Sequence, residues 1–121
     1  MADTHLDRNV LSALQEVMED DYPTLLDTFL SDSEERLRLL RKTDDVAQII
    51  SAAHSFKGSS SNMGAIRLAE LCHELEQRAQ HSLADIPELV MQIDGEFALV
   101  RPLYEAERRR SLADSEAVRR F

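Results

Sequence analysis

The sequence predicts an all-α protein, an antiparallel four-helix bundle with a short additional helix at its N-terminal end. Three observations lead to this fold class. Apolar residues recur at intervals of three and four along most of the 121 residues, which is the period of an amphipathic helix. Nothing alternates strictly between apolar and polar residues, as a half-buried strand would. Gly and Pro number three each, so turn-forming residues are few and long helices with short connections are favoured.

Apolar periodicity places the first two helices. A short one carries its apolar residues at Leu6, Val10, Leu14 and Val17. A longer one begins near Pro23, whose missing N–H does no harm in a first turn. Its apolar positions are Tyr22, Leu25, Leu26, Phe29, Leu30, Leu37 and Leu40.

The third helix is the one that carries the most unusual residues of the chain. Thr43 or Asp44 can cap its start, and Gly64 is a natural stop at its end. Its core-facing residues are expected to be Val46, Ile49, Ile50, Ala53, Phe56, Ser60 and Met63.

Two further helices complete the bundle. The fourth runs from about residue 65 to 80, with Leu68, Leu71, Cys72, Leu75 and Ala79 facing inward. The fifth begins near Asp85, and its apolar residues are Ile86, Val90, Ile93, Phe97, Val100 and Tyr104. Pro102 falls inside this last pattern and is expected to kink or break the helix.

Length, composition and charge indicate a single domain and exclude some classes of function. Residues 1–121 read as one domain, with a bundle core at roughly 22–104 and a helical extension or tail at 105–121. The formal net charge of −9 argues against nucleic-acid binding, which needs a basic surface. The basic run at 108–110 is expected to be a solvated helix end.

The single cysteine, Cys72, cannot form an internal disulfide and is expected to be buried. Without a signal region or membrane-length apolar run, the chain is expected to be a stand-alone cytoplasmic monomer.

The segment 54–64 (HSFKGSSSNMG) contains the candidate functional residues. His54 lies about 120° from the centre of the apolar face of its helix, at the edge of the polar face. Lys57 and Gly58, three and four residues later, are its neighbours on the helix surface. A helical glycine costs roughly 1 kcal/mol relative to alanine, but at position 58 it leaves the space over His54 empty. An exposed imidazole with an ammonium group beside it suits a phosphoryl group.

This segment resembles the signature of histidine-containing phosphotransfer (HPt) domains. Those have a histidine, an apolar residue at +2, Lys-Gly at +3 and +4, small residues, and a glycine at +10. Here these positions are His54, Phe56, Lys57-Gly58, the serines that include Ser61, and Gly64. The residues before and after the segment, at 22–30 and 65–76, also resemble the helices that flank it in the family.

The resemblance implies a role for each site residue. It makes His54 the phosphorylated residue, places Lys57 beside the phosphate, and leaves Gly58, Ser61 and Gly64 to keep the site open or to shape it. Position 76 corresponds to a polar residue of the neighbouring helix that can hydrogen-bond the histidine ring. Here it is Glu76, and the alternative that this side chain only decorates a polar helix face stays open.

The partners that the resemblance implies are the receiver domains of hybrid sensor kinases and response regulators. The chain has neither a phosphate-binding G-x-x-x-x-G-K-[ST] loop nor a kinase glycine-rich loop, so it is not expected to form phosphohistidine from ATP. It would act as a phosphocarrier rather than as an enzyme, with no cofactor or metal of its own. The Mg²⁺ that the transfer needs is expected in the receiver domain.

Two other classes of function compete with this one. A helical docking module whose His54 is never phosphorylated is the main alternative. A metal enzyme is disfavoured, because Glu70 and His73 form a single Glu-x-x-His pair where di-iron bundles need two. The sequence from His73 also begins like H-E-x-x-H, but Gln77 stands at the position of the second histidine. His5, His73 and His81 are expected to lie on the solvated surface.

Overall fold

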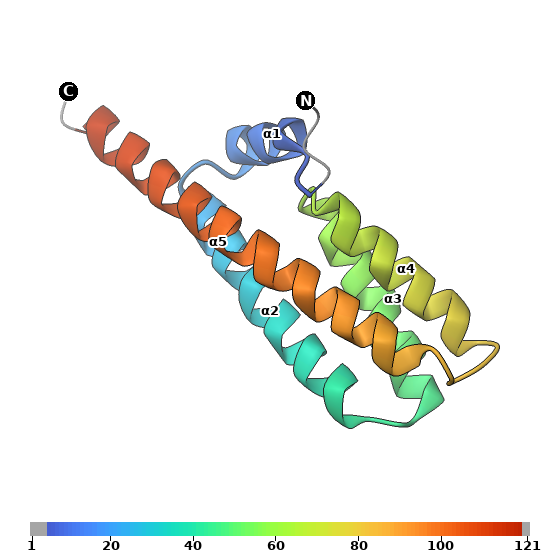
Figure 1. The fold of residues 1–121 in the computed structure, drawn as a ribbon. Coiled ribbons are helices and arrows are strands. Elements are labelled where there is room, and N and C mark those ends of the chain that lie inside the picture. Colours follow the sequence, from blue (N-terminus) through green and yellow to red (C-terminus); the bar gives the residue numbers. More distant parts are fainter. Residues whose placement is uncertain (1–4, 120–121) are drawn as a thin grey trace.

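The computed structural model describes residues 5–119, with side chains to residue 114. Five α-helices follow one another along the chain (Figure 1). They are α1 (Arg8–Met18), α2 (Tyr22–Lys42), α3 (Val46–Asn62), α4 (Ile66–Ala79) and α5 (Ile86–Arg119), with a 3₁₀ turn at Glu19–Asp21 between α1 and α2. In the described part of the chain the only β-type pairing is an isolated bridge between Leu6 and Ala65.

The four long helices form an antiparallel bundle. Helix α3 packs against α2 and α4, and α5 packs against the same two helices, so α3 and α5 lie on a diagonal. Helix α1 lies across the end of the bundle where α3 turns into α4, and α5 extends past that end (Figure 1). The predicted all-α bundle with a short N-terminal helix is therefore confirmed.

The apolar periodicity of the long helices places their residues in the core. Every residue that the sequence assigned to the inner faces of α4 and α5 is buried. Cys72 is among them, and burial raises the pKa of its thiol to about 12. The prediction for the first helix was partly wrong. Val17 is 78% exposed, Leu6 is buried but precedes the helix, and Leu11 is the buried residue within it.

Two predictions for helix ends and interiors were wrong. Asp45, rather than Thr43 or Asp44, caps α3, because its Oδ1 accepts hydrogen bonds from the N–H groups of Ala47 and Gln48 at 2.9 and 3.4 Å. Val46, the first residue of α3, is exposed rather than part of the core.

Pro102 does not break α5, which continues through it to Arg119. A proline leaves the carbonyl group four residues earlier without its helical partner. Here that residue is Ala98, and both Ala98 and Pro102 are exposed. Water can therefore satisfy the carbonyl, while Val100 and Tyr104 hold both halves of the helix in the core.

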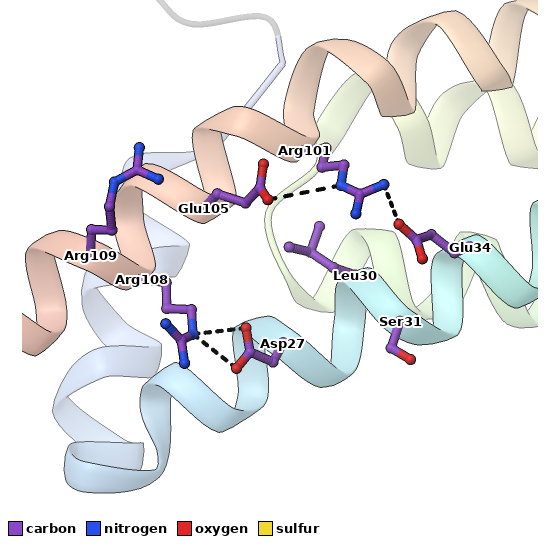
Figure 2. A pocket seen from close by; sticks show the side chains of 8 residues that line it. All are labelled: Asp27, Leu30, Ser31, Glu34, Arg101, Glu105, Arg108 and Arg109. Atoms are coloured by element: carbon purple, nitrogen blue, oxygen red, sulfur yellow. Dashed lines mark hydrogen bonds and ion pairs between the residues drawn. The ribbon is translucent and has the colours of Figure 1, made fainter.

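A ladder of ion pairs joins the outer edges of α2 and α5. Each step of seven residues along α2 is matched by a step of seven residues back along α5, and the pairs are Asp27–Arg108, Glu34–Arg101 and Arg41–Asp94. Figure 2 shows the first two. Side chains seven residues apart lie on the same side of a helix, so three pairs with this spacing fit two helices that run antiparallel and side by side. The basic run 108–110 is therefore not a solvated helix end, since α5 continues beyond it and Arg108 and Arg110 are paired.

The histidines outside the motif have two kinds of surroundings. His73 and His81 are exposed, as expected. The prediction was wrong for His5, which is half-buried with its Nδ1 2.6 Å from Oε2 of the buried Glu96. Among the described residues, no helix is both long and apolar enough to span a membrane.

Candidate functional site

Helix α3 presents His54 to solvent. Its neighbours Ala53 and Phe56 are buried, and they fix which side of the helix faces the core. The side chain of His54 is 69% exposed, as its angular position in the sequence predicted. Such exposure allows an imidazole on a bundle surface to enter the active site of another protein.

Helix α4 supplies the partner of the ring. Nδ1 of His54 lies 2.6 Å from Oε2 of Glu76, whose side chain is only 10% exposed. A carboxylate oxygen can only accept, so at this distance Nδ1 carries the hydrogen and donates it. In the neutral ring the lone pair is then on Nε2, the nitrogen that does not face Glu76. Of the two interpretations that the sequence left open for Glu76, the structure places it against His54.

Lys57 completes the group from the next turn of α3. Its Nζ donates to Oε1 of Glu76 at 2.8 Å, so the two oxygens of one carboxylate hold the lysine and the histidine. The hydrogen bond from Lys57 is the main reason that the pKa of Glu76 lies below its usual value. The hydrogen bond from His54 lowers it further, and partial burial opposes both. Glu76 is therefore ionised at neutral pH and keeps His54 Nδ1–H engaged.

The surface beside His54 is open. A Cβ built on Gly58 meets no atom within 4 Å, and Ser61, one turn further on, is also exposed. His54 lines none of four hollows found among the described residues, two of which, of about 380 and 400 Å³, lie between α2 and α5. The exposed side chain can therefore be reached by another protein.

Gly64 lies apart from this group, at the turn that ends α3. Its φ is +75°, a conformation that glycine adopts without steric cost. Its carbonyl accepts the N–H of Asp7 at 2.8 Å, and the N–H of Ile66 donates to the carbonyl of His5 at 3.1 Å. Gly64 therefore fastens the N-terminal segment to the α3–α4 turn and does not line the surface over His54.

One contact that the sequence did not predict also positions this turn. The hydroxyl of the buried Tyr104, on α5, donates to the carbonyl of Met63 at 2.7 Å. The periodicity of α5 predicts that Tyr104 is buried, but it carries no information about which backbone group its hydroxyl meets. The turn that sets α3 against α4, and hence His54 against Glu76, is thus held from both α5 and the N-terminal segment.

No metal centre accompanies the site among the residues whose side chains are described. They contain no group of three or more His, Cys, Asp and Glu side chains that could hold a metal ion. His73 of the Glu-x-x-His pair is exposed.

Known proteins share both the sequence pattern and the fold. Two curated relatives are the phosphorelay protein LuxU of Vibrio vulnificus strains YJ016 and CMCP6. Each is 28% identical over 92 residues, which cover 72% of this chain and 80% of the relative. The crystal structure of histidine-containing phosphotransfer protein B (HptB) from Pseudomonas aeruginosa PAO1 has a TM-score of 0.87 and 53% identity. The match covers 90% of this chain and 98% of that one.

The family model named Hpt domain matches residues 24–108. This range contains α3, α4 and the three interacting side chains of His54, Lys57 and Glu76. Sequence, fold and site geometry therefore agree, and the chain belongs to the Hpt-domain family of histidine phosphotransfer proteins.

Proposed function

We propose that His54 is the phosphoacceptor through which this protein shuttles a phosphoryl group between receiver-domain aspartates of a two-component phosphorelay. One observation carries the proposal: an exposed imidazole has its Nδ1–H held by a carboxylate, at 2.6 Å from Glu76. This arrangement leaves Nε2 as the nucleophile. Membership of the Hpt family and the similarity to LuxU, a protein named for the phosphorelay, support the same activity.

The phosphoryl transfer needs no proton donor from this chain, because the leaving group is a carboxylate. The lone pair of Nε2 attacks the phosphorus of a phosphoaspartate on the receiver, an N–P bond forms, and the bond from phosphorus to the aspartate oxygen breaks. The aspartate leaves as a carboxylate. The imidazole becomes positively charged as the N–P bond forms, and Glu76 stabilises that charge through Nδ1–H. The reverse steps return the phosphoryl group to a second receiver.

Lys57 acts through charge. Phosphoryl transfer has a loose transition state, so positioned charges supply most of the stabilisation that a protein can offer. The Nζ of Lys57 is within hydrogen-bond distance of Glu76 and one helical turn from His54. We propose that it turns from Glu76 to the phosphate oxygens when His54 is phosphorylated.

The remaining catalytic groups belong to the partner in this proposal. The Hpt family are phosphocarriers, and the sequence has no phosphate-binding loop with which to use ATP. The Mg²⁺ and the phosphoaspartate are supplied by the receiver domain, and no cofactor is assigned to this chain. A cytoplasmic location is part of the same proposal.

Incubation with a radiolabelled phosphorylated receiver domain tests the proposal. We expect label to appear on the wild type as an acid-labile, alkali-stable adduct, and to be absent from His54→Gln. Because the glutamine amide can still donate a hydrogen bond toward Glu76, this variant should keep the helicity of the wild type and nearly the same melting temperature. His73→Gln is the matched control, since His73 is an exposed histidine of α4, and it should accept label normally. Label on His54→Gln would disprove the assignment, and a wild type that binds the receiver without label would favour the docking module.

A further inference from the structure

The outward face of α5 is apolar over about four turns of helix. Its residues fall within a sector of roughly 100° of the helix circumference, and they are Met91, Gly95, Ala98, Leu99, Pro102 and Ala106. All six are exposed, Met91 and Leu99 by 73% and 53%. The other sides of α5 pack against α2 and α4, so no described part of the chain covers this face. Aligned exposed apolar residues of this kind mark contact surfaces, whereas single scattered ones do not.

We infer that this face is a self-association surface, through which two copies of the chain form a low-affinity antiparallel dimer. A two-fold dimer needs a surface that is complementary to itself. A two-fold axis between positions 98 and 99 gives α5 that property, because it sets large residues against small ones. It places Met91 opposite Ala106 of the second copy, Leu99 opposite Ala98, and Gly95 opposite Pro102. The small residues allow the two helices to approach closely.

The same axis brings together two oppositely charged side chains that are unpaired in the monomer. Glu88 and Arg109 flank the apolar face at its two ends, and both are exposed. Among the described residues neither side chain forms an ion pair or hydrogen bond, and Figure 2 shows Arg109 pointing away from the paired Arg108. The axis places Glu88 opposite Arg109 of the second copy. Because the dimer is two-fold symmetric, this ion pair forms at both ends of the interface. Charged pairs at the rim of an interface fix its register.

The position of the face is compatible with phosphotransfer. Because α5 and α3 lie on a diagonal of the bundle, a dimer through α5 leaves His54 of both copies accessible. The contact is a single helix against its symmetry mate, which buries less than the roughly 1,200 Å² of a stable interface. The net charge of −9 also opposes association. A dissociation constant between about 100 μM and 1 mM is therefore expected, which refines the monomer that the sequence predicted.

Sedimentation equilibrium of the whole chain at about 0.15 M salt, where charge repulsion is screened, tests the surface. We expect the wild type to show a concentration-dependent average mass, and Leu99→Glu to remain monomeric with unchanged circular dichroism. Arg109→Glu should weaken the dimer at least severalfold by opposing like charges. Glu88→Arg combined with Arg109→Glu should restore it. A wild type that stays monomeric at about 1 mM, or a double variant that stays as weak as Arg109→Glu, would overturn the inference.

Disulfide trapping tests the antiparallel register separately. Ala98→Cys places two thiols beside the two-fold axis, whereas Met91→Cys places them about 22 Å apart along the helices. A disulfide needs Cα atoms within roughly 7 Å, so mild oxidation should link Ala98→Cys into dimers and leave Met91→Cys monomeric. The buried Cys72 does not interfere. Equal cross-linking of the two variants would contradict the antiparallel pairing.

Discussion

The Nζ atom of Lys57 lies 2.8 Å from Oε1 of Glu76, on the carboxylate whose other oxygen faces the ring of His54. The cation expected beside a phosphate is therefore paired with a carboxylate in the unphosphorylated protein. This pairing holds the cation one helical turn from His54, so Lys57 has only to turn from Glu76 to reach the oxygens of an arriving phosphoryl group and stabilise their charge. The pairing also means that a change at Lys57 affects Glu76 as well as the phosphate.

Replacement of the cation tests this double role. Lys57→Ala should slow transfer from a phosphorylated receiver by roughly one to two orders of magnitude, as for the loss of one electrostatic stabiliser. It should also lower the free energy of unfolding by about 1 kcal/mol, because Glu76 loses a charge-assisted hydrogen bond. Rapid-quench kinetics with the receiver in excess and below saturation, together with urea unfolding, measure the two effects.

The matched control is Lys57→Arg, which keeps a positive charge at the same position. It should recover most of the stability and part of the transfer rate. Transfer kinetics of Lys57→Ala equal to those of the wild type would remove Lys57 from the mechanism.

The depressed pKa of Glu76 makes part of the stability depend on pH. An unfolded glutamate titrates near pH 4.3, and the folded value is lower because Lys57 and His54 hydrogen-bond the carboxylate. The stabilisation is therefore present above about pH 4.3 and is lost as the pH falls through the folded pKa. The difference in the free energy of unfolding between the wild type and Glu76→Gln should be larger at pH 7 than at pH 3. Urea unfolding at both values measures it, and a difference independent of pH would contradict the ion pair.

The fold could be predicted because the long helices keep one apolar period from end to end. The inner faces of α4 and α5 contain every residue expected there, since burial of such a face decides where a long helix packs. The short first helix could not be predicted in the same way. Leu6 continues its period and yet forms a bridge to Ala65 before the helix begins, while Val17 points to solvent. The position of Leu6 depends on its pairing with the α3–α4 turn, which is distant in the sequence.

The candidate site was predictable to the extent that it lies within one helix. His54, Lys57 and Gly58 share a surface of α3 because residues three and four apart always do. Glu76 is on another helix, and only the packing of α3 against α4 shows that its carboxylate meets His54 rather than solvent. The role of Gly64 needed the structure for the same reason, because its φ and its contact with Asp7 are tertiary features.

A side chain at position 64 should destabilise the protein. A Cβ there would lie 3.0 Å from the carbonyl oxygen of Asp7 and 3.2 Å from Cβ of Val10, and the backbone has φ +75°. Gly64→Ala should therefore lower the free energy of unfolding by about 2 kcal/mol, from backbone strain together with the close contacts. Chemical denaturation measures this loss. Stability equal to that of the wild type would show that the N-terminal segment does not constrain the turn.

Gly58 should respond in the opposite way, because the space around it is empty. A Cβ at this position meets no atom within 4 Å, so Gly58→Ala should raise the free energy of unfolding by up to about 1 kcal/mol through helix propensity. Gly58→Gln should be no less stable than the wild type. Its longer side chain leans over His54, so it should slow phosphotransfer and weaken binding of the receiver together.

Gly95→Gln is the matched control for Gly58→Gln, because Gly95 is also a helical glycine with open space around it, on α5. At micromolar concentration, where self-association is negligible, it should gain stability and transfer phosphate at the wild-type rate. The contrast separates steric access to His54 from the general effect of replacing a helical glycine. Wild-type transfer by Gly58→Gln would show that a receiver does not use the space over His54, even if His54 remained the acceptor.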